Sequence, residues 1–229
     1  MATVIGSRIT YAEFRDLPDD GVLYELLDGA VVTRASPTGR HQDLIGDLYA
    51  RLRAAAQAAN LGLVRLGPFD VVLDEYNVTL PDLIFVRTER AAIITNVGCF
   101  GAPDLIVEAL SPTSIERDLR DKLGSYERAG VALHWVLDPV KEQVRRFALA
   151  SGHYAEQPLL SREDILTTPL FPSLQLALHD LFASANLVQA LAREPQAPDV
   201  DPERVRFLEQ WHLRRNQRQG RPRQRPPSS

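Results

Sequence analysis

The chain has 229 residues and a single cysteine, Cys99, which excludes an internal disulfide framework and a thiolate zinc site. Residues 201–229 hold 8 Lys and Arg against 3 Asp and Glu, or +5, so the net charge of −4 leaves −9 on residues 1–200. The acidic body argues against a broad electrostatic footprint for DNA, but carboxylates are the ligands that divalent cations use.

The first part of the chain mixes short strands with one long helix. The pair Asp28-Gly29 between two apolar runs predicts a β-hairpin, and Ile45, Leu48 and Leu52 at helical spacing predict an amphipathic helix. In chain order we expect a short helix capped by Thr10 and ended by Pro18, hairpin strands at 23–27 and 30–33, a helix at about 40–59, and strands near 62–66, 69–74 and 82–86.

The second part contains the most hydrophobic strand. We expect a loop at 87–102 with room for a helical turn, a central strand at 104–110, a helix at 113–130 capped by Thr113 or Ser114 and ended by Gly130, strands at 132–139 and 142–149 with a meander extended by 152–157, and a closing strand and helix at 161–183. This order predicts an α/β or α+β fold with a mixed sheet flanked by helices.

The composition changes after residue 183. We expect one domain at 1–183, a short helix and linker at 184–200, and a basic, Arg-rich tail at 201–229 that is helical and then disordered. The stripe of Val205, Leu208 and Trp211 could dock on the body or on a second subunit; the arginines could instead contact phosphate or stay solvated. No apolar run reaches the roughly 20 residues of a membrane span, and no signal-peptide pattern opens the chain, so we expect a cytoplasmic protein.

A glutamate interrupts the apolar stretch "PDLIVEALSP". Side chains alternate along a strand, so Glu108 shares a face with Ile106 in a strand that is apolar on both faces. A buried charge without a partner is costly, so Glu108 either forms a structural ion pair or meets a ligand or metal at the strand end. Asp104 is interpreted as a cap or turn residue that opens the strand.

Two further residues join Glu108 in a candidate site. Lys122 lies at the edge of the apolar stripe of the following helix and so points toward that strand, with Asp118 one turn before it. "LPDLIFV" places Asp82 at the entrance of a neighbouring strand. Two carboxylates and a lysine are suited to phosphodiester hydrolysis assisted by Mg²⁺ or Mn²⁺, in which the lysine orients water or stabilises developing charge.

These motifs resemble a known family. "YELLDG" (24–29), "SPTGRHQDLIGDL" (36–48), "LPDLIFV" (80–86), "APDLIVEALSPTSIERDLRDKLGSYERAGVALHWVLDP" (102–139) and "GHYAE" (152–156) resemble the Uma-type restriction-endonuclease family of the PD-(D/E)XK nuclease superfamily. The resemblance covers about 10–183 and implies a restriction-endonuclease-like core that cleaves DNA with a divalent metal. It also implies a homodimer, because nucleases of this fold commonly use two active sites on a duplex, and no organic cofactor.

The resemblance assigns roles residue by residue. Asp82 matches the aspartate of "PD" and Glu108 the (D/E), both as metal ligands. The usual lysine position holds Leu110 here, so Lys122 on the next helix becomes the matching basic residue. Glu25 and His41 resemble an auxiliary carboxylate and a phosphate or acid–base group, although a cross-strand-paired glutamate and a satisfied inner-face histidine are the alternatives. A nuclease fold without turnover, acting as a nucleic-acid-binding or regulatory protein, is the competing hypothesis.

Overall fold

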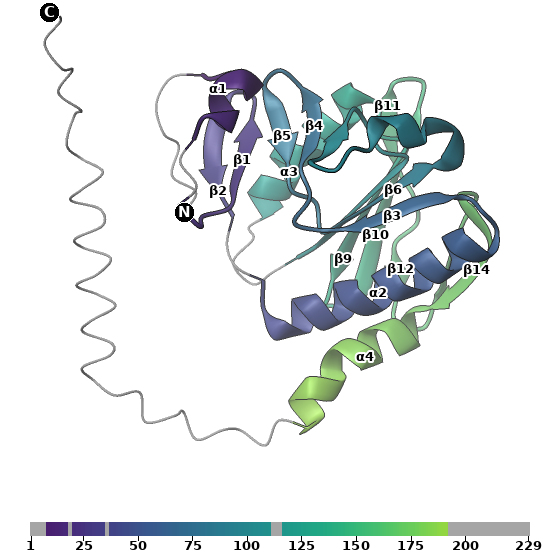
Figure 1. Cartoon of the computed structure of the whole chain (residues 1–229). Coiled ribbons are helices and arrows are strands. Elements are labelled where there is room, and N and C mark those ends of the chain that lie inside the picture. Colours follow the sequence, from purple (N-terminus) through teal and green to yellow (C-terminus); the bar gives the residue numbers. More distant parts are fainter. Residues whose placement is uncertain (1–7, 18–19, 35–36, 111–115, 192–229) are drawn as a thin grey trace, which may run out of the picture. The chain divides into compact units, whose positions relative to one another are not determined.

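The computed structural model describes residues 8–17, 20–34, 37–110 and 116–191, and the side chains of these except 116–121 and 185–191. The chain divides after Val188 into two units, and the first contains the sheets (Figure 1). Among the described residues, no helix combines the length and the apolar character needed to cross a membrane. The predicted linker and basic tail beyond 191, and the predicted caps Thr113 and Ser114, lie outside these ranges.

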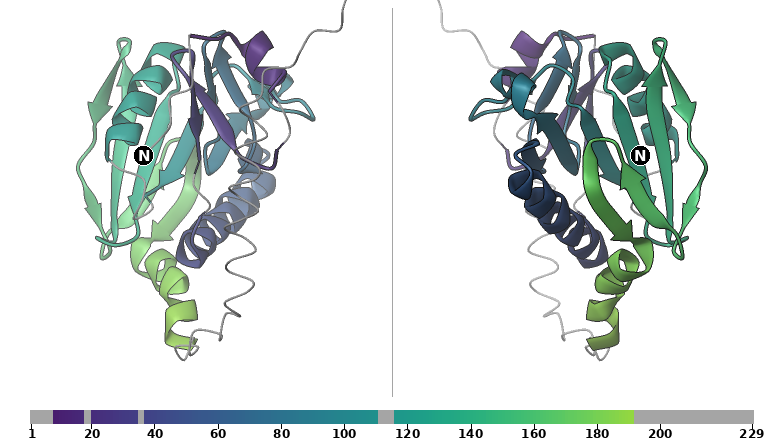
Figure 2. Two further views of the ribbon diagram at one scale, coloured as in Figure 1. Left: turned by 90° about the vertical axis from the view of Figure 1, so that its left-hand side faces the viewer. Right: turned by 90° about the vertical axis from the view of Figure 1, so that its right-hand side faces the viewer.

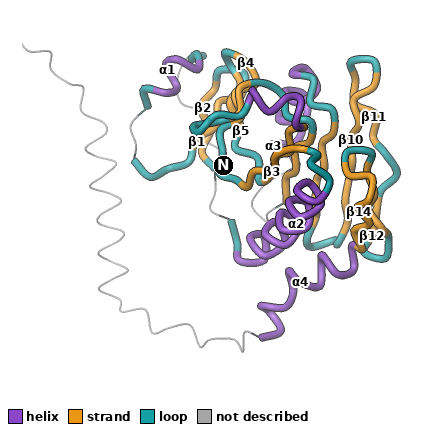
Figure 3. Tube along the Cα trace, turned by 45° about the vertical axis from the view of Figure 1, so that its right-hand side comes forward, coloured by secondary structure: helices purple, strands orange, loops and turns teal. Residues whose placement is uncertain are grey.

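A seven-stranded mixed sheet forms the centre of the first unit (Figure 3). Its strands in spatial order are β11 (His153–Glu156), β10 (Gln143–Ala150), β9 (Leu133–Asp138), β8 (Leu105–Ala109), β6 (Leu83–Arg87) and β3 (Gly62–Leu66), with β12 (Leu160–Ser161) also paired to β10. β8 and β9 are parallel and the other neighbours antiparallel. Parallel neighbours need a crossover connection, and α3 (Glu116–Ala129) supplies it.

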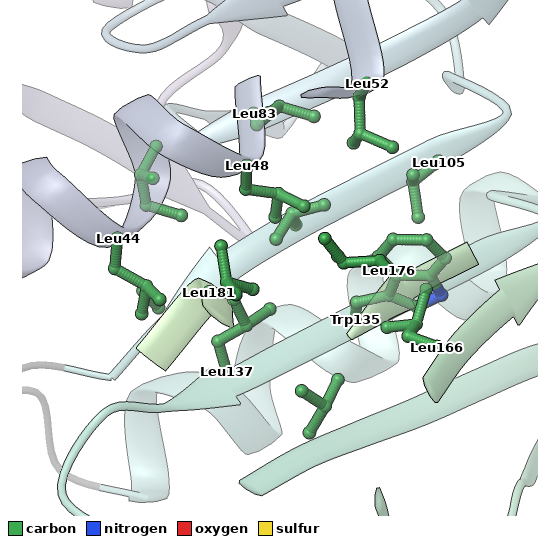
Figure 4. Packing of buried hydrophobic residues seen from close by; sticks show 14 of the residues in the cluster. Leu44, Leu48, Leu52, Leu83, Leu105, Trp135, Leu137, Leu166, Leu176 and Leu181 are labelled. Atoms are coloured by element: carbon green, nitrogen blue, oxygen red, sulfur yellow. The ribbon is translucent and has the colours of Figure 1, made fainter. Parts of the chain in front are cut away.

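One face of this sheet packs against helices and a small hairpin. Leu83, Leu105 and Trp135 point to this face and belong to the largest buried apolar cluster (Figure 4). The elements that cover them are α2 (Gly39–Ala58), α4 (Leu178–Leu191) and the hairpin of β13 (Ile165–Thr168) and β14 (Phe171–Ala177). Figure 2 shows α2 and α4 together, away from α3. The inner stripe of α2, including Leu44, Leu48 and Leu52, is almost fully buried, as its spacing predicts.

The opposite face carries Ile84, Val86 and Ile106 and packs against α3 and a second sheet. The five strands of that sheet in spatial order are β2 (Ala30–Thr33), β1 (Tyr24–Leu27), β5 (Asn77–Thr79), β4 (Val71–Asp74) and β7 (Cys99–Phe100). Because alternate residues of one strand supply both clusters, the central strands are buried on both sides.

Local sequence signals account for the N-terminal part. Thr10 and Glu13 form a capping box at the start of α1 (Tyr11–Arg15), in which the Glu13 carboxylate accepts the Thr10 N–H at 2.8 Å. Asp28 and Gly29 both have positive φ, 48° and 82°, as the two-residue turn between β1 and β2 requires. The predicted cap and hairpin are therefore confirmed.

Several short elements differ from the prediction. The helical turn expected within 87–102 is the 3-10 helix η1 (Thr88–Ile93), but β7 in the same segment and β5, just before the predicted strand at 82–86, were not predicted. Strands of two or three residues are too short to show a period in the sequence. The segment 161–183 forms a hairpin rather than one strand, and α4 continues through 184, where two helices were expected.

Candidate active site

The two predicted metal ligands, Asp82 and Glu108, lie at adjoining ends of β6 and β8. The pair Leu83–Val107 is the last in the antiparallel register, so Asp82 and Glu108 come next on each strand. The Ala109 N–H donates to Asp82 Oδ2 at 2.7 Å, which fixes that carboxylate against β8. Both acids are nearly buried, at 6% and 5% exposed, and they are in step with Ile84 and Ile106 on the face toward α3.

Helix α3 brings Lys122 and Tyr126 to Glu108. Lys122 Nζ lies 3.1 Å from Glu108 Oε1, and the Tyr126 hydroxyl donates to the same oxygen at 2.8 Å. The two side chains are four residues apart, one helical turn, so both reach the same acid. The prediction that Lys122 points toward the strand, and not into solvent, is confirmed by its 8% exposure.

Glu25 joins this cluster from β1 of the second sheet. Its Oε1 accepts the Leu80 N–H at 2.7 Å and lies 2.7 Å from Lys122 Nζ. Lys122 is therefore held between Glu25 and Glu108, 97 and 14 residues away along the chain. Glu25 is only 4% exposed, and its charged partner lies on α3 rather than on a neighbouring strand.

His41 and Arg34 both approach Asp82 Oδ1. His41 lies in the first turn of α2, where its N–H donates to Thr38 Oγ1, and its Nε2 is 3.1 Å from Asp82 Oδ1. Within the described part of the chain its buried Nδ1 has no hydrogen-bond partner. Arg34, which follows β2, donates from its guanidinium to Asp82 Oδ1 and to the Leu80 carbonyl.

Opposing effects set the charge states of the two strand-end acids. Burial would raise the pKa of Asp82, but His41, Arg34 and the Ala109 N–H outweigh it and lower the pKa. Burial raises the pKa of Glu108; Lys122 opposes this, and the nearby carboxylates of Asp82 and Glu25 reinforce it. Of the two strand-end acids, Asp82 therefore has the lowered pKa and Glu108 the raised one.

The two groups on α3 keep their protons. Burial would lower the pKa of Lys122, yet the charges of Glu108 and Glu25 raise it above its ordinary value. Burial and the same two carboxylates raise the pKa of Tyr126. Lys122 is thus a permanent ammonium and Tyr126 a neutral hydrogen-bond donor, so neither is suited to act as a base near neutral pH.

The donor chemistry of the cluster fits a hard divalent cation. Three carboxylates, from Glu25, Asp82 and Glu108, face only two permanent cations, Arg34 and Lys122, so the cluster has a surplus of negative charge. Carboxylate oxygens on two adjoining strands are the ligands that Mg²⁺ and Mn²⁺ prefer. In the described part of the chain, no three His, Cys, Asp or Glu side chains already converge as a complete ligand set. Asp82 and Glu108 would therefore hold a metal together with water or substrate oxygens.

The other candidates lie elsewhere. Asp104 opens β8, as expected, and its buried carboxylate accepts hydrogen bonds from the Arg87 N–H, the Arg87 guanidinium and Arg90. Trp135 is a core residue. Cys99 is buried, and burial raises the pKa of its thiol to about 12. The side chain of Asp118 is outside the described residues.

Two contacts of the cluster were not predicted. Tyr126 is fully buried, and its hydroxyl also donates to Glu108. Its place four residues after Lys122 was the available signal. Arg34 was not singled out, because an arginine just after a strand carries no local sign of a partner 48 residues away.

The fold and the cluster together define the class: a restriction-endonuclease-like α/β protein with an acidic and basic cluster at the end of its central strands. Residues 11–179 match the family Uma2, described as "Putative restriction endonuclease", and the chain belongs to this family. Among the solved structures that match is a putative nuclease belonging to DUF820 from Anabaena variabilis. It is 20% identical, with a TM-score of 0.66, and the match covers 77% of this chain and 99% of that one. No curated protein matches the chain.

Proposed function

We propose that this protein is a divalent-metal-dependent endonuclease that hydrolyses phosphodiester bonds of DNA. Asp82 and Glu108 would hold Mg²⁺ or Mn²⁺, and Lys122, Glu25 and His41 would complete the site. The family description supports nuclease chemistry. The observation that carries the proposal is that Asp82, paired with His41, and Glu108, paired with Lys122 and through it with Glu25, come from distant parts of the chain to the adjoining ends of β6 and β8.

Each residue has a role that follows from its contacts. When bound, the metal would polarise the scissile phosphate and lower the pKa of a water ligand. Lys122, held as an ammonium, would orient the attacking water or stabilise negative charge on the phosphate. Glu25 keeps Lys122 beside Glu108, since both carboxylates contact the same ammonium. His41, whose Nδ1 is not used within the described residues, could donate to or accept from a phosphate or leaving group.

The test compares purified wild type with Asp82→Asn, Glu108→Gln and Lys122→Gln on supercoiled plasmid and single-stranded DNA, with Mg²⁺ or Mn²⁺. We expect metal-dependent cleavage by wild type and a loss of about 100-fold or more in each variant, the scale for removing a group that stabilises transition-state charge. Arg65→Gln is a matched control, because Arg65 lies on β3 and its guanidinium donates to the Val64 carbonyl. Cleavage that persists in all three variants would refute the site assignment.

The same assay separates the competing function. The acidic body gives a reason to consider a regulatory or nucleic-acid-binding protein without turnover. DNA binding by wild type with no cleavage under any metal condition would favour that reading. A homodimer and a cytoplasmic location remain predictions; sedimentation of the protein with and without DNA tests the first, and cell fractionation the second.

A further inference from the structure

Arg34 is hydrogen-bonded to Asp82, the carboxylate that the proposed function assigns to the metal. Its guanidinium donates to Asp82 Oδ1 and to the Leu80 carbonyl. The N–H of the same Leu80 donates to Glu25. The other oxygen of Asp82 is taken by the Ala109 N–H, an interaction that belongs to the strand backbone. A metal would therefore bind at Oδ1, to which Arg34 is bonded and from which His41 Nε2 lies 3.1 Å away.

The side chain of Arg34 can leave without unfolding its strand. The backbone N–H of Arg34 donates to the Leu23 carbonyl at 2.9 Å, which extends the β1–β2 hairpin by one residue. The side chain is 19% exposed, against 6% for Asp82, so its outer part already reaches solvent. Rotation about the side-chain bonds is enough to release Asp82 while the backbone stays in place.

Because both are positively charged, Arg34 and a divalent metal would not bind Asp82 at the same time. With Arg34 in place, three carboxylates face two permanent cations. A divalent cation at Asp82 Oδ1 would lie next to the guanidinium, and like charges at such distances repel strongly in a buried site. Removing the guanidinium relieves that repulsion and frees the oxygen for the metal.

We propose that Arg34 and the divalent cation compete for Asp82, so that Arg34 closes the metal-free site and is released when the metal binds. The inference rests on the proposed function. Once released, the guanidinium is a planar, permanently charged donor beside the site, suited to a phosphate oxygen of the nucleic acid. Arg34 would thus exchange one anionic partner, Asp82, for another, the substrate backbone.

The first test is the affinity of the protein for Mn²⁺ alone, measured by isothermal titration calorimetry. The variants are Arg34→Gln and, as a matched control, Arg40→Gln. Arg40 is a partly buried arginine whose guanidinium donates to the Pro139 carbonyl and lies 3.9 Å from Glu142 Oε1. Removing one charged hydrogen bond from Asp82 predicts Mn²⁺ binding about 10- to 100-fold tighter in Arg34→Gln. Arg40→Gln should bind as wild type does. Equal or weaker Mn²⁺ binding by Arg34→Gln would overturn the inference.

The second test uses the unaltered chain, in case Arg34→Gln does not fold. Phenylglyoxal modifies accessible arginines, and mass spectrometry of the digest reports each one. We expect modification of Arg34 to rise several-fold when Mg²⁺ is added, with that of Arg40 unchanged. Constant modification of Arg34 at saturating Mg²⁺ would overturn the exchange.

Asp82→Asn separates the inference from the function beneath it. If Asp82→Asn loses Mn²⁺ binding but Arg34→Gln binds no tighter than wild type, the metal site stands and the competition fails. If Asp82→Asn binds Mn²⁺ as wild type does, the metal is not at Asp82, and the proposed site and the inference fail together.

Discussion

His134 is a buried histidine whose replacement should change how stability depends on pH. It lies on β9 beside Ile106 of β8, is 0% exposed, and neither ring nitrogen has a hydrogen-bond partner among the described residues. The rings of Tyr126, Phe147 and Tyr154 surround it at centroid distances of 5.0, 5.9 and 6.5 Å. A charged imidazole there would have no partner, so the folded protein holds His134 neutral.

The magnitude follows from the difference in proton binding between the folded and unfolded chains. Burial, helped by the positive charges of Lys122 and Arg145, lowers the pKa of His134 to about 3, from 6.5. Below about pH 6.5 the unfolded chain binds a proton that the folded chain does not, so the free energy of unfolding falls as the pH falls. At about pH 5 this amounts to about 2 kcal/mol, because each pKa unit is worth about 1.4 kcal/mol.

The assay is urea unfolding, followed by circular dichroism, of wild type and His134→Phe at about pH 7.5 and about pH 5. Phenylalanine keeps the aromatic contacts and cannot be protonated, so the variant should lose about 2 kcal/mol less than wild type over this range. His179→Gln, at an exposed position on α4, is the control and should follow wild type. Equal losses in wild type and His134→Phe would refute the reasoning, as would an NMR titration of folded His134 near pH 6.5.

Three further predictions concern single contacts. Asp104→Asn should lower the free energy of unfolding by about 2 kcal/mol at neutral pH, because two arginines lose a buried charged acceptor. Burial would raise the pKa of Asp104, but those arginines and the Arg87 N–H lower it. The difference in stability between wild type and variant should therefore shrink below about pH 4. Tyr126→Phe should cost about 1 kcal/mol in urea unfolding and leave the secondary structure unchanged, since the hydroxyl that donates to Glu108 is lost while the ring stays in place. Leu48→Ala, in the α2 stripe, should cost about 2–5 kcal/mol and lower the thermal midpoint, whereas an exposed alanine substitution at Val140 should not.

Parts of the cluster were predictable because their signals are local. Asp82 and Glu108 each interrupt an apolar run, and the alternation of side chains fixes the face on which each lies. Lys122 was predicted to point inward from its place beside an apolar helical stripe, and the structure places it there. Glu25 and His41 carried no such signal on their own and were selected only through the resemblance to the family.

The remaining contacts depend on which distant segments lie together. Arg34 meets Asp82 only because the β1–β2 hairpin folds beside the end of β6, and no spacing in the sequence predicts that approach. The short strands β5 and β7 likewise depend on pairing with neighbouring strands, through Leu26 of β1 and Val71 of β4, more than on their own two or three residues. The ion pairs of Asp104 with Arg87 and Arg90 also could not be predicted, because nothing local in the sequence distinguishes these arginines from solvated ones.

The two acids at the end of β6 and β8 also bear on folding fidelity. A slip of one residue between these strands would turn Glu108 from the α3 side to the side of the leucine-rich cluster around Leu48 and Trp135. There the carboxylate would meet neither Lys122 nor Tyr126, and an unpaired buried charge costs several kcal/mol. The misaligned chain would be penalised at the position on which the proposed chemistry depends. The two acids therefore help to specify the register of the central sheet, and the correct register is also the one that assembles the site.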